Sequence, residues 1–291
     1  MRIGIIGAGR VGCSLALALS DRKLPIGIYG RNPASVEFAA QIPYCNISED
    51  LTHLVEASDT VFITVPDSSI QAVALGIVSS SGPGGLVGKV FLHCSGALSS
   101  GVLECIGSEG GCTGSLHPIQ TFPDRTASWK NMLGIYFGFE GMLEAEAASK
   151  EIVGLLNGTM LTVNEGSKSL YHAAACVLSN YMVTLSHTAA RMLERAGIDR
   201  ETGSRAFAPL LHSTVVNING LGSVEALTGP ISRGDATTIS AHLEALEQQL
   251  PDETELYRSL GRATVRLALE KGTIDEDRAQ ELTWLLGVSD I

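Results

Sequence analysis

The segment Gly7-Ala8-Gly9-Arg10-Val11-Gly12 matches the pattern G-x-G-x-x-G near the start of the chain. It follows an apolar run at residues 3–6, typical of a strand, and opens a segment with helical spacing at residues 11–20. In this context the first glycine permits a tight turn, the second lets the backbone approach a pyrophosphate, and the third allows close helix packing. The helix N-terminus then favours an anion. We expect a dinucleotide on a Rossmann domain; the alternative is a glycine-rich turn that binds nothing.

The end of the second apolar run, residues 25–29, decides which dinucleotide fits. An Asp or Glu there, about 20 residues after the glycine turn, would accept from the ribose 2′-hydroxyl of NAD. This chain instead reads Tyr29-Gly30-Arg31-Asn32, and Arg31 can hold a 2′-phosphate through a charge-assisted contact. Arg31 and Asn32 are therefore cofactor-binding candidates, and NADP(H) is favoured over NAD(H). A solvated loop cation is the alternative for Arg31.

The spacing of apolar residues divides the chain into two parts. Strand-like runs alternate with helical segments, as in parallel βαβ units, at residues 3–6, 25–29, 61–65 and 90–93. Further strands, some of them open to an antiparallel arrangement, are expected at residues 114–116, 134–139 and 160–163, with a helix at 144–156. Helical spacing then continues through residues 167–196, 200–219, 236–250, 253–271 and 276–286, with stop signals at Gly197, Gly222 and Gly272. We predict an α/β fold, with an N-terminal Rossmann domain at residues 1–164 followed by an all-helical C-terminal domain at residues 165–291.

Composition excludes several classes of partner. The length of 291 residues lies near the limit of roughly 250 to 300 residues for one core, which agrees with two domains. The chain has 31 acidic and 20 basic residues, and its net charge of −11 repels nucleic acid and anionic lipid. The 6 cysteines show no Cys-x-x-Cys spacing, so no metal site is indicated and a reducing, cytoplasmic location is expected. No run of about 18 apolar residues occurs, so no membrane partner is expected.

Two loops follow predicted strands on the side where a doubly wound sheet binds ligands. They read Val65-Pro66-Asp67 and His93-Cys94-Ser95-Gly96. Ligands lie outside the carboxyl ends of such strands, so these loops should border the cofactor. The cofactor-binding candidates here are Val65, Pro66, Ser95 and Gly96. A purely structural role for either loop stays open.

Ser95 and His117 are the first catalytic candidates. Each follows or ends a predicted strand on the cofactor side, and together they supply a hydroxyl donor and a titratable imidazole. An imidazole can move a proton near neutral pH, as carbonyl or imine reduction requires. The alternative is that His117, which precedes Pro118, only anchors a turn.

The long helix expected at residues 167–196 carries a polar stripe. At about 100° per residue, an arc of about 120° holds Lys168, His172, Cys176, Ser179, Asn180 and His187. The stripe is too long to touch one small substrate. We favour Lys168, His172 and Asn180 for the site. A subunit interface or a set of buried, satisfied polar groups would explain the stripe equally well.

The helical half offers one more candidate and a mode of assembly. The Gly/Pro-rich loop at residues 227–235 contains Arg233, which could clamp a substrate carboxylate, while Asp235 is placed to cap the next helix. The helix at residues 167–196 is too long and too apolar for the small helical half to cover alone. We therefore expect a homodimer formed through the helical domain.

The whole chain resembles the Rossmann-like proteins that pair an NADP-binding domain with the helical domain of unknown function 2520. The resemblance rests on four segments, which are the glycine motif, residues 115–122, residues 171–175 with Ser179-Asn180, and residues 227–235 with His242. More distantly it is similar to the superfamily of 6-phosphogluconate dehydrogenase, ketopantoate reductase, pyrroline-5-carboxylate reductase and prephenate dehydrogenase. Hydroxyacid and ketopantoate relatives use Lys-x-x-x-Asn on the long helix, whereas Lys168 is followed here by His172. Prephenate dehydrogenases carry a Ser and a His-Pro on neighbouring strand ends, which resembles Ser95 and His117-Pro118.

Together these features predict an NADP(H)-dependent oxidoreductase. The expected reaction moves a hydride to or from a small, carboxylate-bearing carbonyl, imine or hydroxy acid. His117 and Ser95 would manage the proton, and the resemblance makes a ketopantoate reductase-like activity a named candidate. The alternatives are a prephenate dehydrogenase-like enzyme and a non-catalytic NADP(H)-binding regulator.

Overall fold

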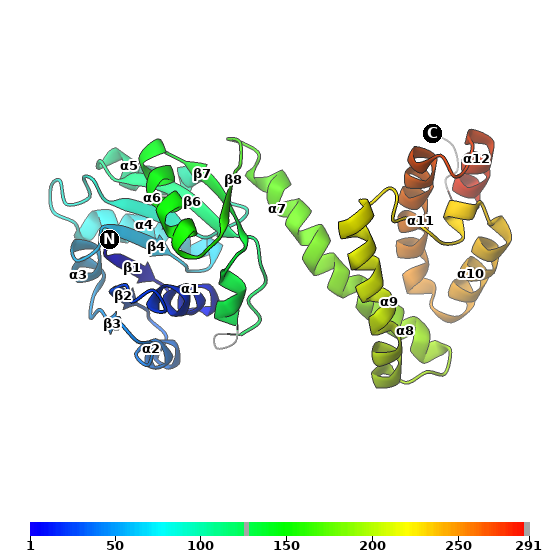
Figure 1. The fold of residues 1–291 in the computed structure, drawn as a ribbon, viewed down its shortest axis with the longest axis horizontal. Helices are drawn as coiled ribbons and strands as arrows, with labels where there is room; N and C mark the ends of the chain where they lie inside the picture. Colours follow the sequence, from blue (N-terminus) through cyan, green and yellow to red (C-terminus); the bar gives the residue numbers. More distant parts are fainter. Residues whose placement is uncertain (125–127, 288–291) are drawn as a thin grey trace. The chain divides into compact units, whose positions relative to one another are not determined.

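The computed structural model describes residues 1–124 and 128–287 of the chain. It contains two compact units, Met1–Asn180 and Tyr181–Ile291, and each is described by itself. The first unit is built on an eight-stranded sheet of order β3-β2-β1-β4-β5-β6-β7-β8 (Figure 1). The second unit is helical.

The sheet is parallel except where β6 meets β7. Its strands are β1 (Ile3–Ile6), β2 (Ile26–Tyr29), β3 (Cys45–Ile47), β4 (Thr60–Ile63), β5 (Val90–His93), β6 (Cys112–Pro118), β7 (Tyr136–Gly141) and β8 (Thr159–Thr162). The central strands are short, uninterrupted apolar runs because a parallel sheet is covered on both faces. In the antiparallel pair, His117 of β6 stands opposite Gly138 of β7.

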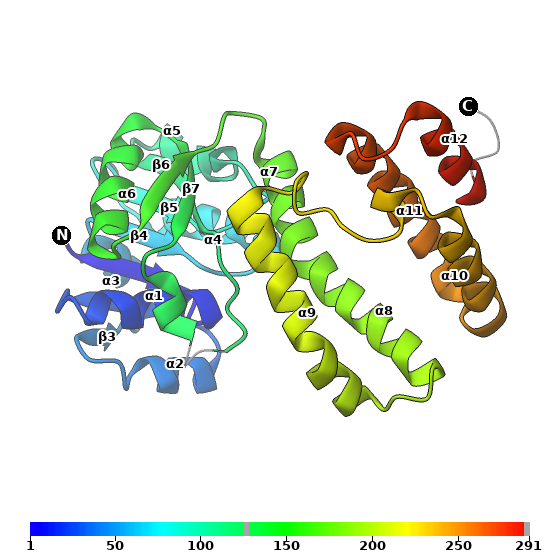
Figure 2. The ribbon, with the colours of Figure 1, turned by 45° about the vertical axis from the view of Figure 1, so that its right-hand side comes forward.

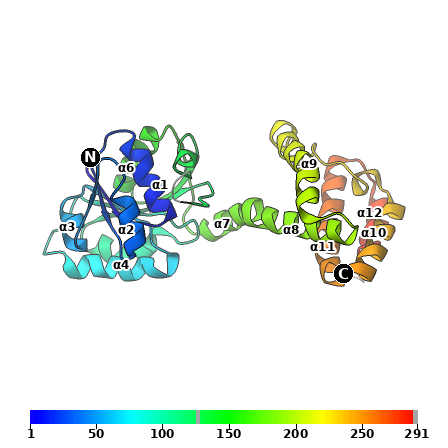
Figure 3. The ribbon, with the colours of Figure 1, turned by 90° about the horizontal axis from the view of Figure 1, so that it is seen from below.

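Helices cover both faces of this sheet, as Figure 3 shows with α4 on one side and α1 and α6 on the other. The helices that pack on the sheet are α1 (Arg10–Ser20), α2 (Pro33–Ala39), α3 (Leu51–Glu56), α4 (Asp67–Ser80), α5 (Glu104–Ser108) and α6 (Leu143–Leu155). Successive strand residues point to opposite faces. Ile5 accordingly belongs to the core under α1 and α6, whereas Ile6 belongs to the core under α3, α4 and α5.

The helical region begins after β8 with α7 (Lys168–Cys176), which passes through a π-helical turn (Val177–Tyr181) into α8 (Met182–Arg195). In the second unit α8 and α9 (Arg200–Leu221) lie side by side, and α10 (Ala236–Gln249), α11 (Pro251–Lys271) and α12 (Glu276–Leu285) share a separate core (Figure 2). None of the helices in residues 1–124 and 128–287 is long and apolar enough to cross a membrane.

Most expected elements are confirmed. The strand at residues 3–6 and that at 90–93 match exactly in extent, and the stop signals Gly197, Gly222 and Gly272 have φ values of 86°, 83° and 73°. Asp235 caps α10, since its Oδ1 accepts from the backbone N–H of Thr238 at 3.0 Å. The expected domain boundary, 164/165, lies between the end of β8 and the start of α7, whereas the two compact units separate between Asn180 and Tyr181.

Candidate active site

The glycine turn after β1 shows why each glycine is needed. Gly7 has φ +112°, and a Cβ on it would lie 2.9 Å from the backbone of Thr64. A Cβ on Gly12 would overlap the carbonyl oxygen of Gly7, so the expected roles of both residues in the turn are confirmed. Gly9 differs, because the nearest protein atom to such a Cβ is the Thr64 carbonyl oxygen at 3.9 Å. Nothing in the described part of the chain requires a glycine at position 9, and the space over it can take a ligand group.

The N-terminus of α1 has no side-chain cap, as is also the case for α4, α6, α7, α8 and α11. Its N-cap is Gly9, no side chain accepts from its first N–H groups, and no acidic residue lies in its first turn. Side-chain caps are present elsewhere, at Asn32 for α2, Asp50 for α3, Asp199 for α9, Asp235 for α10 and Asp275 for α12. Uncapped N–H groups at a helix start favour an anion. The glycine turn thus fits the pyrophosphate of a dinucleotide.

The loop after β2 contains Arg31 and Asn32. Asn32 has a structural role that its sequence position did not reveal, since its Oδ1 accepts from the backbone N–H of Ser35 at 3.0 Å and from the Ser35 hydroxyl at 3.1 Å. Arg31 is exposed and forms no ion pair with any residue that the structure describes. Its guanidinium is therefore available to a phosphate, and the cofactor-binding roles of both residues stay predictions.

The loops after β4 and β5 are joined by the hydroxyl of Ser95. This hydroxyl donates to Oδ2 of Asp67 at 2.7 Å and accepts from the backbone N–H groups of Ala97 and Leu98 at 3.2 and 3.0 Å. Val65 lies beside Gly7, with its Cγ1 3.1 Å from the place of a Gly7 Cβ. The single hydroxyl proton of Ser95 is thus used within the loops, and this geometry does not offer it to a substrate.

Lys168, in the first turn of α7, places a buried cation beside the ends of β5 and β6. Its Nζ donates to the carbonyl oxygen of Ser95 at 3.0 Å and to the hydroxyl of Ser115 at 2.8 Å, and the residue is 2% exposed. No carboxylate in the described part of the chain lies within ion-pair distance of it. Burial lowers the pKa of Lys168 because it penalises the charged form.

His117, at the end of β6, meets two side chains of α7. Its Nδ1 lies 2.7 Å from the hydroxyl of Tyr171, and its ring stands nearly perpendicular to that of His172, with centroids 5.9 Å apart. Burial lowers the pKa of His117 to about 4, and the charges of Lys168 and His172 act in the same direction. The imidazole is therefore neutral near neutral pH.

Gly96 lies between the two histidines. A Cβ on Gly96 would overlap Nδ1 of His172 and would lie 3.0 Å from Nε2 of His117. Nδ1 of His172 is buried and has no hydrogen-bond partner among residues 1–124 and 128–287. The structure thus brings together the candidates Gly96, His117, Lys168 and His172, and it leaves one buried nitrogen for a ligand to satisfy.

Sequence reasoning missed Tyr171 and Asp67. Tyr171 follows Lys168 by three residues, so the two share one face of α7, and the helical spacing could have pointed to it. Gly138 of β7 makes room for its ring, because a Cβ there would overlap the Tyr171 hydroxyl. Asp67 starts α4 and was seen only as part of a loop.

Asn180 and Arg233 lie on two other elements. Asn180 belongs to the π-helical turn, whose winding is wider than that of the ideal α-helix on which the expected polar stripe rests. Arg233 ends a short 3-10 helix of the second unit, Ile231–Arg233. Catalytic and substrate-binding roles for the two stay predictions.

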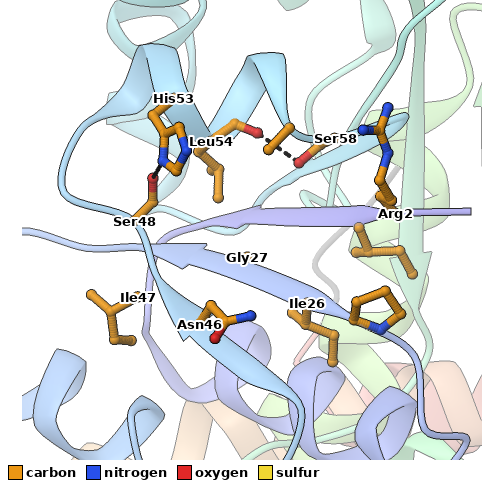
Figure 4. A pocket seen from close by; sticks show the side chains of 12 residues that line it. Arg2, Ile26, Gly27, Asn46, Ile47, Ser48, His53, Leu54 and Ser58 are labelled. Atoms are coloured by element: carbon orange, nitrogen blue, oxygen red, sulfur yellow. Dashed lines mark hydrogen bonds between the residues drawn. The ribbon is translucent and has the colours of Figure 1, made fainter.

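A separate cavity of about 340 Å³ lies between α3 and the sheet (Figure 4). Its lining comes from the amino ends of β1 and β2, from β3 and from α3. The hydroxyl of Ser48 lies 3.3 Å from Nδ1 of His53 there. None of the candidate residues lines it. It therefore lies apart from the glycine turn and from the group formed by Gly96, His117, Lys168 and His172, which we call the histidine cluster.

Comparison with known proteins identifies both halves of the chain. A family model described as a Rossmann-like domain matches residues 1–118, and one described as a domain of unknown function (DUF2520) matches residues 135–264. No curated protein sequence matches the chain.

Solved structures share the fold over nearly the whole length. A Bacteroides fragilis protein described as an NADP oxidoreductase is 24% identical, with a TM-score of 0.73 and coverage of 90% of this chain and 96% of its own. A reductive aminase from Aspergillus terreus, in complex with NADPH and ethyl levulinate, is 15% identical, with a TM-score of 0.66 and coverage of 97% and 98%. A Plasmodium falciparum pyrroline carboxylate reductase with NADP bound is 16% identical, with a TM-score of 0.63 and coverage of 99% and 98%. The two family models thus match the chain one after the other, a Rossmann-like domain at residues 1–118 and the DUF2520 domain at residues 135–264.

Proposed function

We propose that this protein is an NADP(H)-dependent oxidoreductase that transfers a hydride to or from a small carbonyl, imine or hydroxy acid. The observation that carries the proposal is the uncapped start of α1, where Gly9 leaves a space that no atom of the described residues fills. Exposed Arg31, without a neighbouring acid in residues 29–32, supports the 2′-phosphorylated cofactor. Two of the structural neighbours hold NADPH or NADP, which supports the same choice.

The proposed division of labour follows from the positions of the side chains. The bound cofactor supplies or accepts the hydride. The glycine turn binds its pyrophosphate, Arg31 holds the 2′-phosphate, and the loops at Val65 and Gly96 border it. His117 acts on the substrate at the end of β6, next to the buried cation of Lys168.

The substrate that we propose carries a carboxylate. Lys168 gives the histidine cluster a positive local field within a chain whose net charge is −11, and Arg233 is a further candidate to bind the carboxylate directly. Arg233→Ala should then raise KM for carboxylate substrates more than for their methyl esters. Equal effects on acid and ester would remove Arg233 from the site.

The working form that we propose is a homodimer that pairs through the helical region. Gly203 is the one buried residue of α9, all of which lies in the described part of the chain. Its exposed apolar side chains include Phe207, Leu210, Leu211, Val215, Val216 and Leu221. Exposed apolar surface of this extent marks an interaction site, and a symmetric second copy is the commonest partner.

The cofactor proposal is tested by calorimetric titration of NADPH against three proteins. Gly9→Ala should fold normally, because its backbone is extended (φ −78°, ψ −166°) and no protein atom lies closer than 3.9 Å to the new methyl group, yet it should lose NADPH affinity. Gly154→Ala on α6, where nothing lies within 4 Å of the added Cβ, is the matched control and should bind like wild type. Wild-type affinity in Gly9→Ala would count against a pyrophosphate at this turn.

Turnover is tested by following the nicotinamide absorbance with a panel of keto acids, cyclic imines and hydroxy acids. Oxidation of NADPH, or reduction of NADP, with any member supports the enzyme. NADPH binding without turnover of any member would favour a cofactor-binding regulator and overturn the oxidoreductase.

A further inference from the structure

The protons shared by His117 and Tyr171 can be assigned from their partners. The Tyr171 hydroxyl has one hydrogen, and its one hydrogen-bond partner among the described residues is Nδ1 of His117, at 2.7 Å. Burial raises the pKa of Tyr171 to about 12, so the phenol keeps its hydrogen. If Nδ1 carried a hydrogen, the phenol hydrogen would have no acceptor among the residues that the structure describes. The arrangement that satisfies both groups has Tyr171 donating to Nδ1, which leaves the ring hydrogen on Nε2.

Nε2 of His117 is directed at the end of β5. It lies 3.0 Å from the place that a Cβ of Gly96 would occupy, a place that Nδ1 of His172 also approaches. The carboxyl end of β5 is where a doubly wound sheet presents its ligand. The N–H group of His117 is therefore the polar group that β6 presents at this end of the sheet.

The charges around His117 favour its neutral form. The titratable groups that face it from the neighbouring elements are those of Lys168, Tyr171 and His172 on α7, Asp67 on α4 and His93 on β5. The cation of Lys168 is buried, and the carboxylate of Asp67 already accepts from Ser95. Burial is the largest cause that lowers the pKa of His117 to about 4, Lys168 and His172 lower this pKa further, and Asp67 raises it by less.

We propose that Tyr171 is a positioning residue that holds His117 as the neutral Nε2–H tautomer, and that the site therefore takes a neutral carbonyl rather than a protonated imine. The substrate half of this proposal rests on the proposed oxidoreductase function. A neutral imidazole that donates through N–H polarises a carbonyl oxygen without an imidazolium.

The chemistry of the two substrate classes differs in charge. Addition of a hydride to a carbonyl carbon moves the π electron pair onto oxygen, which gains negative charge and is then protonated by water. The Nε2–H group of His117 donates to that oxygen, and the Lys168 cation stabilises the charge as it develops. A protonated imine brings a positive charge to the same place, where Lys168 repels it and His117 offers no lone pair at Nε2.

The tautomer is tested by NMR on protein labelled with ¹⁵N-histidine, which needs neither substrate nor turnover. Near neutral pH the wild type should show a protonated Nε2 and an unprotonated Nδ1 for His117. Tyr171→Phe should convert this signal into a mixture of tautomers, because the donor to Nδ1 is lost. Tyr136→Phe, which alters an exposed tyrosine of β7 (57% exposed), is the control and should keep the wild-type signal. A proton on Nδ1 in the wild type would overturn the proposal.

The substrate class is tested with a keto acid and a cyclic imine of the same carbon skeleton. The wild type should favour the keto acid by at least about tenfold in kcat/KM, and Tyr171→Phe should lower kcat for it by roughly 10-fold or more while NADPH affinity is kept. Equal or better use of the imine would overturn the substrate assignment. If neither compound nor any member of the wider panel reacts, while Nε2–H is observed in the wild type and becomes a mixture in Tyr171→Phe, the oxidoreductase and the substrate class fail together and the role of Tyr171 in setting the tautomer stands by itself.

Discussion

The ammonium group of Lys168 donates a 2.8 Å hydrogen bond to the hydroxyl of Ser115, which joins the first turn of α7 to the buried middle of β6. The two residues are 53 positions apart in the sequence, and Ser115 is fully buried. Neutral oxygens hold this cation, and no carboxylate of the described residues forms an ion pair with it, so its charge acts on nearby titratable groups such as His117.

This relationship predicts the effect of Lys168→Met on His117. Removal of the cation should raise the pKa of His117, because Lys168 is the largest charge that lowers it. An NMR titration of the His117 ring measures the shift. Lys150→Met on α6 is the control, since Lys150 is exposed and pairs with Glu146. An unchanged pKa in Lys168→Met would show that burial alone keeps His117 neutral.

His117→Ala should abolish turnover and leave NADPH affinity nearly intact. A donor that stabilises the oxygen charge in the transition state lowers kcat when it is lost, by ~10²- to 10³-fold for one such hydrogen bond. Steady-state kinetics and calorimetry on the same preparation separate the two effects. His53→Ala, an exposed histidine of α3, should behave like wild type. If His117→Ala keeps the wild-type kcat, His172 is the next residue to test.

Arg31→Ala should weaken NADPH binding and leave NADH binding unchanged. A hydrogen bond to a charged group contributes about 1.5 to 3 kcal/mol, so the loss of affinity should be roughly 10- to 100-fold. Titration of both cofactors against Arg31→Ala and wild type measures it. Arg266→Ala on α11 removes another exposed arginine and controls for net charge. Equal affinity of the wild type for the two cofactors would contradict this prediction.

Stability should fall as the pH drops from about 6.5 to about 4. Burial lowers the pKa of His93, and likewise that of His117, from 6.5 to about 4, so the unfolded chain binds more protons than the folded chain within this window and each histidine contributes to the slope. The full effect of such a shift is about 3 kcal/mol, gained above the window and lost below it. Urea denaturation at several pH values measures the slope. His93→Asn should flatten it, whereas His53→Ala should not. A slope unchanged by His93→Asn would assign the effect to other groups.

The homodimer prediction is tested by light scattering. The wild type should show a mass near twice that of the 30.6 kDa chain. Leu210→Asp, which places a charge on the exposed apolar face of α9, should shift the protein toward monomer. The control is Leu75→Asp on α4, an exposed leucine (51%) in the other unit. A single 30.6 kDa species of the wild type at micromolar concentration would refute the dimer.

Several elements of the structure could be recognised from the spacing of neighbouring residues in the sequence. The run at residues 3–6, the glycine turn, the helix stops and the cap at Asp235 were all recognisable, because each rests on residues within one or two turns of chain. The short strand β3 and the separate helices α2 to α4 were not placed, since their apolar spacing is weak and packing on the sheet stabilises them.

Tertiary structure alone decided how the candidate side chains are used. The position of Ser95 made it a reasonable catalytic candidate. Only the fold brings Oδ2 of Asp67 within 2.7 Å, where it accepts the hydrogen bond of the Ser95 hydroxyl. Tyr171 meets His117 across 54 residues of sequence because Gly138 leaves room on the next strand, and no spacing rule encodes such a contact. Local sequence fixes φ, ψ and amphipathic faces, whereas partners, burial and pKa values depend on residues that meet only after the sheet and helices have packed.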